Sequence, residues 1–200
     1  MPVIKNCLFY GNKATNGYGT LDFYDNCVAD IINCTIADNT GKNSFGGIYA
    51  TDSDVAIINS IIWHNGISLN GSFITASHSC IENGIPGPGN ISSDPIFRRG
   101  PLGNYYLSQQ SAGQLATSLA VDGGMDSASD VYGPAGHGYT TRTDNTEDSS
   151  WVDMGYHYKA AAGPIAYFVL TTNVTPPGTG TVSITPNAPN YKQYSEVQLQ

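Results

Sequence analysis

Hydrophobic and polar residues form short groups along residues 1–90, and these groups recur at a nearly constant interval. The segment Asn6–Asn12, with the sequence NCLFYGN, returns as Asn33–Asn39 and as Asn59–Asn65, and a weaker copy begins at His78. Successive copies start 27, 26 and 19 residues apart. A regular interval of this size is typical of a solenoid, in which each repeat packs on its neighbours.

Aligned positions of the copies predict strands, because small and β-branched residues occupy them. Three aligned sets are expected to face inward: Ile4, Ile31 and Ile57; Cys7, Cys34, Ser60 and Ser79; and Phe9, Ile36, Ile62 and Ile81. Clusters of Gly, Asn, Asp and Ser separate the groups and leave no room for a helix of ten residues. We therefore expect each repeat to be one turn of a parallel β-helix, with turns stacked about 4.8 Å apart.

Two sets of asparagines mark the expected corners of each turn. Strict alternation must break between the inward positions 4 and 7, and Asn6, Asn33 and Asn59 lie at that break. We expect their amides to stack and to hydrogen-bond along the helix axis. A second set, Asn12, Asn39 and Asn65, marks the next corner.

Several motifs of the coils and of the segment after them resemble a known group of proteins. The coil NCTIADNT at residues 33–40, with GGIY at 46–49 and NSIIW at 59–63, resembles the right-handed parallel β-helix repeats of secreted bacterial proteins. These repeats belong to the pectate-lyase-like superfamily and are close to the polymorphic outer-membrane-protein type. Residues 89–97 and the segment WVDMGYHY at 151–158 are similar to the stretch that ends such helices. The resemblance implies an extracellular or cell-surface location.

The expected fold is all-β: a right-handed parallel β-helix with a loop-rich C-terminal cap and a small partial β module. We expect coils over residues 1–90, the cap over 91–159, a linker over 160–166 and the truncated module over 167–200. The last segment is similar to the B repeats of internalins. The first coil lacks a polar cap, so we expect further coils upstream or self-association there.

Composition removes several classes of function. Charged residues make up 12% of the chain, there are 23 glycines, and the formal net charge is −8. So few charges exclude a coiled coil, and the negative balance predicts no binding to nucleic acid or to an anionic membrane surface. No apolar run reaches the length of a membrane span. We expect any export signal to lie on sequence outside the printed chain.

Acidic residues on the coils are the candidate catalytic groups. Hydrolysis of a glycosidic bond needs two carboxyl groups, and Asp52 and Asp54 would point to the same face of an extended chain. Asp38 and His64 hold equivalent positions in successive coils; Asp38 is a further candidate catalytic carboxylate, with His64 in support. The alternative is structural. Asp52 and Asp54 can serve as turn residues, and Asp38 and His64 can simply be solvated at the surface.

Aromatic and acidic residues suggest two further kinds of site. Tyr10 and Trp63 share one outward repeat position, with Tyr49 on a strand nearby, and sugars stack on exposed rings. The alternative is that these rings pack against neighbouring chain. Three acids near the end of the expected cap, Asp144, Asp148 and Asp153, concentrate oxygen ligands and could bind calcium. No cofactor is certain from the sequence.

The leading prediction is a secreted or surface scaffold that engages extracellular polysaccharide as a non-catalytic module. One alternative is a glycoside hydrolase using the Asp pair, and another is an adhesin or structural stalk. A lyase is disfavoured: the resemblance implies an Arg or Lys base beside calcium-binding acids, and residues 1–90 contain only Lys5, Lys13 and Lys42.

Overall fold

The computed structural model describes residues 1–66, 68–71, 73–133, 138–160, 166–175 and 181–200. Its N-terminal part consists of three parallel sheets, each built from strands of successive passes of the chain. Sheet 1 contains β1 (Val3–Lys5), β4 (Val28–Ile32), β7 (Asp54–Ile58) and β10 (Ile74–Ser77). Sheet 2 contains β2 (Leu8–Tyr10), β5 (Thr35–Ala37), β8 (Ile61–Trp63) and β11 (Cys80–Ile81). Sheet 3 contains β3 (Leu21–Phe23), β6 (Ile48–Ala50) and β9 (Leu69–Asn70).

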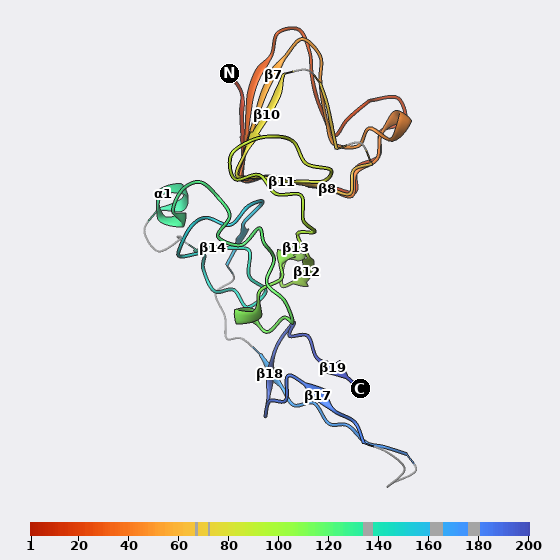
Figure 1. The fold of residues 1–200 in the computed structure, drawn as a ribbon, viewed down its shortest axis with the longest axis vertical. Helices are drawn as coiled ribbons and strands as arrows, with labels where there is room; N and C mark the ends of the chain where they lie inside the picture. The colour runs from red at the N-terminus through yellow and green to blue at the C-terminus, as the bar shows by residue number, and fades with distance from the viewer. Residues whose placement is uncertain (67, 72, 134–137, 161–165, 176–180) are drawn as a thin grey trace.

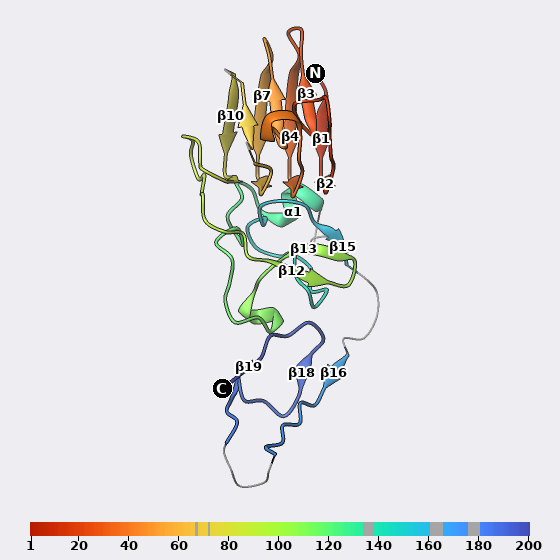
Figure 2. The same cartoon turned by 90° about the vertical axis from the view of Figure 1, so that its right-hand side faces the viewer.

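The stacked order of these sheets is compatible with a β-helix. Each of the first three passes contributes one strand to each sheet, and the fourth contributes β10 and β11 to sheets 1 and 2. Each pass pairs in parallel with the pass before it, as Figure 2 shows for β1, β4, β7 and β10. The expected registers are confirmed: Ile4 pairs with Ile31 and Ile31 with Ile57 in sheet 1. Ile36 and Ile62 pair in sheet 2 and are fully buried. The apolar core therefore lies between the sheets.

The thiols and hydroxyls of the second aligned set hold the backbone at the corner between sheets 1 and 2. The amide of Cys7 donates to Sγ of Cys34 at 3.4 Å, and the amide of Cys34 donates to Oγ of Ser60 at 3.1 Å. Ser60 and Ser79 continue the ladder at 3.1 Å, and the amide of Ser79 donates to Oδ1 of Asn90, also at 3.1 Å. The position thus requires a small side chain that accepts a hydrogen bond.

The two asparagine corners behave differently. Asn39 donates to Oδ1 of Asn65 and accepts from the side chain of Asn12, both at 2.9 Å, so this amide ladder is confirmed. At the other corner Asn6, Asn33 and Asn59 have φ near +50°, which confirms the break in the strand. The expected hydrogen bonding between these amides is wrong. The side chains of Asn6 and Asn59 bond to a later part of the chain, described next, and the buried amide of Asn33 has no hydrogen-bond partner among the described residues.

The described residues of the segment 91–159 fold against the outer face of sheet 2 (Figure 1). Their elements are β12 (Phe97–Gly100), β13 (Gly103–Leu107), the 3₁₀ turn Gln110–Ala112, α1 (Ala128–Tyr132), β14 (Tyr139–Thr140) and β15 (Tyr158–Lys159); a further 3₁₀ turn, Lys42–Ser44, lies in the coils. Both faces of β5 and β8 are buried as a result. Backbone and side-chain bonds fix the contact: Gly155 N donates to Asn59 O at 2.7 Å, and His157 N donates to Oδ1 of Asn6 at 2.8 Å.

The last residues form two short antiparallel pairs at the far end of the molecule from sheet 1 (Figure 1). The first joins β16 (Tyr167–Phe168) to β18 (Tyr191–Lys192), and the second joins β17 (Ile184–Thr185) to β19 (Gln198–Leu199). Residues 161–165 of the expected linker lie outside the described residues. Glu196 pairs with Arg98 at 2.6 Å, which connects these strands to β12. None of the described helices is long and apolar enough to cross a membrane.

Candidate functional site

Four aromatic rings gather on the outer face of sheet 3. We call this cluster the aromatic patch; it consists of Tyr18, Tyr24, Phe45 and Tyr49. Tyr49 lies at its centre, with its ring stacked on Tyr18 at 4.9 Å between centroids and tilted against Tyr24 at 5.9 Å. The side chain of Tyr24 is exposed. The patch therefore offers apolar ring surface beside hydroxyl groups, on the side of the coils away from the core.

Polar side chains flank the central ring. Asp22 and Asn70 occupy the same register position as Tyr49 on the two neighbouring strands, so all three point outward in one row. Partial burial raises the pKa of Asp22, although backbone amides of Gly19 and Tyr18 oppose the shift. An acceptor and an amide thus stand on either side of an aromatic surface.

Four places along the chain contribute to the patch, and Tyr24 directly follows β3. Tyr49 is on β6, Tyr18 lies in the loop before β3, and Phe45 follows the 3₁₀ turn at Lys42–Ser44. The sequence singled out Tyr49 alone. The signal it missed is that aromatic residues cluster just before aligned strands, where a loop can fold back over the sheet.

The predicted pair Asp52 and Asp54 lies at a separate place, in a groove beside sheet 1. The groove has a volume of about 400 Å³ and is also lined by Val28 and Phe73. It continues across the outer face of β4, β7 and β10, where Asp30 and Thr75 are among its lining residues. Asp52 itself has φ of 49°, a conformation that Asp tolerates at turns, so the structural interpretation explains its presence as well.

Asp38 and His64 are brought together at the corner that follows sheet 2, and not with Asp52 and Asp54. Oδ1 of Asp38 lies 3.5 Å from Nδ1 of His64, and Oδ2 accepts from the hydroxyl of Tyr105 at 2.7 Å. Both corner residues have positive φ, 56° and 54°. Their shared position is therefore explained by backbone geometry. Both side chains are half or more exposed, and Asp38 links the coils to β13 through Tyr105.

The other two predicted glycan-binding residues both meet residues 91–159. Tyr10 stays 56% exposed and contacts Tyr105, at the edge of a cleft of about 280 Å³ that Tyr156 and Tyr158 also line. Trp63 is only 8% exposed and packs in a cluster with Leu107 and Met154. Its ring is covered by the chain and offers little surface to a sugar.

Asp144 is separated from the other two predicted metal ligands by its own partners. Arg142 binds both of its carboxylate oxygens, at 3.0 and 2.9 Å, and Nζ of Lys192 lies 3.0 Å away. Burial alone would raise the pKa of Asp144, but the hydrogen bonds from Arg142 and Lys192 outweigh it and hold the pKa well below its usual range. This carboxylate is compensated without a metal ion.

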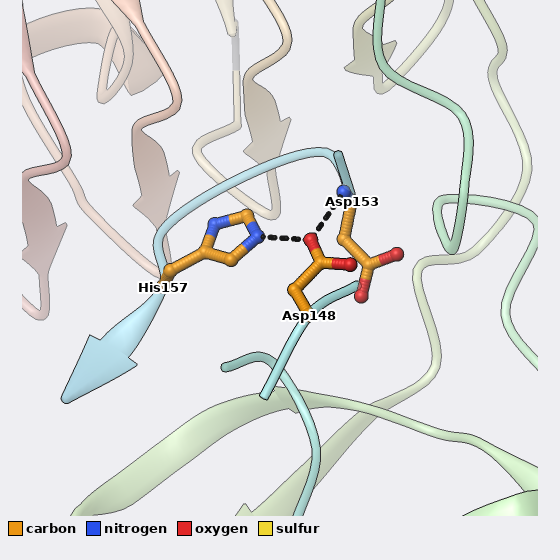
Figure 3. Close-up of side chains that lie close together, drawn as sticks. All are labelled: Asp148, Asp153 and His157. Carbon is orange, nitrogen blue, oxygen red and sulfur yellow. Dashed lines mark hydrogen bonds and ion pairs between the residues drawn. The ribbon is translucent and has the colours of Figure 1, made fainter. Parts of the chain in front are cut away.

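Asp148 and Asp153, in contrast, lie side by side with a residue that the metal prediction did not include, His157 (Figure 3). Oδ2 of Asp148 lies 2.9 Å from Nε2 of His157 and accepts from the amide of Asp153 at 3.0 Å. All three residues are buried. Burial, with the charge of Asp148 adding to it, raises the pKa of Asp153.

A match was sought among protein-family models, curated proteins and solved structures, and none was found.

Proposed function

We propose that this chain is part of a secreted or cell-surface scaffold that binds extracellular polysaccharide without cleaving it, through the aromatic patch. The scaffold is a right-handed parallel β-helix of the pectate-lyase-like type, and residues 167–200 begin an internalin-B-repeat-like module. The stacked parallel sheets and the recurring coil motif, of which NCTIADNT at residues 33–40 is one copy, support this interpretation of the fold.

One observation carries the binding proposal: Tyr49, the central ring of the aromatic patch, lies in an outward row between Asp22 and Asn70. A sugar ring presents an apolar face to an aromatic ring and hydroxyl groups at its rim. The row offers the ring in the middle and hydrogen-bonding groups on both sides. Ligand sites of this kind combine apolar surface with a few placed polar groups.

The charge of the chain favours an uncharged glycan. The net charge is −8, and the carboxylate of Asp22 lies beside the central ring. A uronate or sulfated chain would be repelled at this surface unless cations bridged it. We therefore expect neutral polysaccharides to bind better than acidic ones, and the difference to shrink as salt is added.

Retention on insoluble polysaccharides and affinity electrophoresis in soluble ones test the proposal. Tyr24→Ala and Tyr49→Ala should each weaken binding about 2- to 10-fold, since a ring contact is worth about 0.5–1.5 kcal/mol. The matched control is Tyr167→Ala, which removes an exposed tyrosine ring from β16, outside the aromatic patch. Equal binding by all three variants, or no retention on any glycan, would contradict the proposal, and the second result would favour a stalk.

A second candidate function is glycoside hydrolysis in the groove beside sheet 1. The observation that favours it is that Asp52 and Asp54 line one groove together with an exposed ring, Phe73. Release of reducing ends from a neutral polysaccharide, abolished in Asp52→Asn or Asp54→Asn, would establish catalysis. No release by the unaltered protein from any substrate of the panel would leave binding as the function.

A further inference from the structure

Among the described residues, the buried group of Asp148, Asp153 and His157 places two carboxylates beside one imidazole. The two aspartates are 6% and 3% exposed, and His157 is fully buried. Arg142 lines the neighbouring cavity, but its guanidinium is bound by Asp144. Two carboxylates buried together need a compensating proton or cation, because an unpaired buried charge is costly.

The hydrogen bonds of His157 turn one ring nitrogen toward these carboxylates. Its Nδ1 lies 3.1 Å from the carbonyl oxygen of Gly155, an acceptor, so Nδ1 carries a proton. In the neutral ring, Nε2 then has a lone pair that faces Oδ2 of Asp148 at 2.9 Å. Two acceptors at this distance require a proton on one of them or a metal ion that both coordinate. A backbone carbonyl behind the ring is also the usual support of a metal-binding histidine.

The carboxylate of Asp153 is oriented by neighbours that would act as a second layer of ligand support. Its Oδ2 accepts from Nε2 of Gln109 at 3.2 Å and from the hydroxyl of Thr141, and its Oδ1 accepts from the amide of Asp122 at 2.7 Å. Beside it lies a polar cavity of about 230 Å³, lined by both aspartates of the group. This cavity is large enough for the waters that would complete a coordination shell.

We propose that Asp148, Asp153 and His157 bind one divalent transition-metal ion, with Zn²⁺ as the favoured ion. One atom from each residue lies within 4.8 Å of the others, so a single ion can reach all three. Imidazole together with carboxylate suits Zn²⁺, whereas Ca²⁺ takes 6 to 8 oxygen ligands. The ion would join the loop that contains Asp148 to the segment 151–158, which packs on sheet 2 through Met154 and Gly155.

Calorimetric titration of chelator-treated protein with Zn²⁺, Co²⁺ and Ca²⁺ tests the proposal. One equivalent of Zn²⁺ should bind, and free Zn²⁺ at about 100 times the dissociation constant should raise the melting temperature by about 5–10 °C. Asp153→Asn and His157→Gln should each weaken Zn²⁺ binding at least about tenfold. The matched control is His64→Gln, which alters a histidine–aspartate pair elsewhere and should bind as the unaltered chain does.

Three results would overturn the proposal: no saturable binding of one equivalent, preference for Ca²⁺ over Zn²⁺, or unchanged binding in both ligand variants. If a variant does not fold, X-ray absorption of the Zn²⁺-loaded unaltered chain decides. One imidazole with oxygen ligands at about 2.0–2.2 Å supports the site. A sulfur shell at about 2.3 Å would instead assign the ion to the cysteines and refute it.

Discussion

Replacing Asn39 by alanine should cost more stability than any other single change in the amide ladder, because this side chain uses both ends of its amide. Its Oδ1 accepts from the backbone and the side chain of Asn12, both at 2.9 Å. Its Nδ2 donates to the carbonyl of Phe9 at 3.0 Å and to Oδ1 of Asn65 at 2.9 Å. The side chain of Asn39 is fully buried, so water cannot replace these hydrogen-bond partners.

The four lost hydrogen bonds, at about 0.5–1.5 kcal/mol each, predict a decrease of about 2–6 kcal/mol in the free energy of unfolding. For a chain of this size, the melting temperature should fall by about 10 °C. Urea unfolding and thermal melts followed by circular dichroism measure both quantities.

The matched control is Asn12→Ala, at the exposed end of the same ladder. It removes one side-chain hydrogen bond and leaves the backbone bond to Asn39 in place, so the loss should stay below about 1.5 kcal/mol. If Asn39→Ala destabilises the protein no more than Asn12→Ala does, the ladder does not stabilise the coils and the reasoning is refuted.

Three further predictions concern packing, the backbone ladder and pH. Trp63→Ala should lower the free energy of unfolding by about 3–5 kcal/mol in a urea titration, since the ring is buried in an apolar cluster; a fully stable variant that loses glycan retention would contradict this. Ser60→Ala leaves the amide of Cys34 without its acceptor and should cost about 1–3 kcal/mol, while Ser60→Cys, which repeats the residue of earlier coils, should cost less; equal losses would count against the ladder. The lowered pKa of Asp144 means that its ion pairs stabilise the fold fully above its usual pKa of 3.8 and lose this effect as the pH falls below it. The stability difference between the unaltered chain and Asp144→Asn should therefore shrink on acidification, and a constant difference across pH 2–6 would refute this assignment.

The three parallel sheets could be predicted from the sequence because the contacts between their strands recur at the interval of the sequence repeat. A residue in one coil meets the residue 26 or 27 positions further on, so aligned identities such as Asn12, Asn39 and Asn65 report directly on contact. The same logic gave the inward isoleucines of sheet 1 and the small residues of the corner ladder. Positive φ at Asp38 and His64 also follows the repeat, which explains why polar residues recur there.

The repeat pattern alone was therefore enough to predict the stacking of the coils, the registers of their strands and the position of their corners. Only the tertiary structure decided the environment of the candidate site residues. Trp63 is buried because residues 91–159 return to cover sheet 2, and Tyr49 gains Tyr18 and Phe45 because two loops fold over sheet 3. The contact between His157 and Asp148 also forms within the segment that covers sheet 2. These contacts occur once, between segments without a shared repeat, so no aligned pattern records them; they depend on where irregular loops place the chain in space.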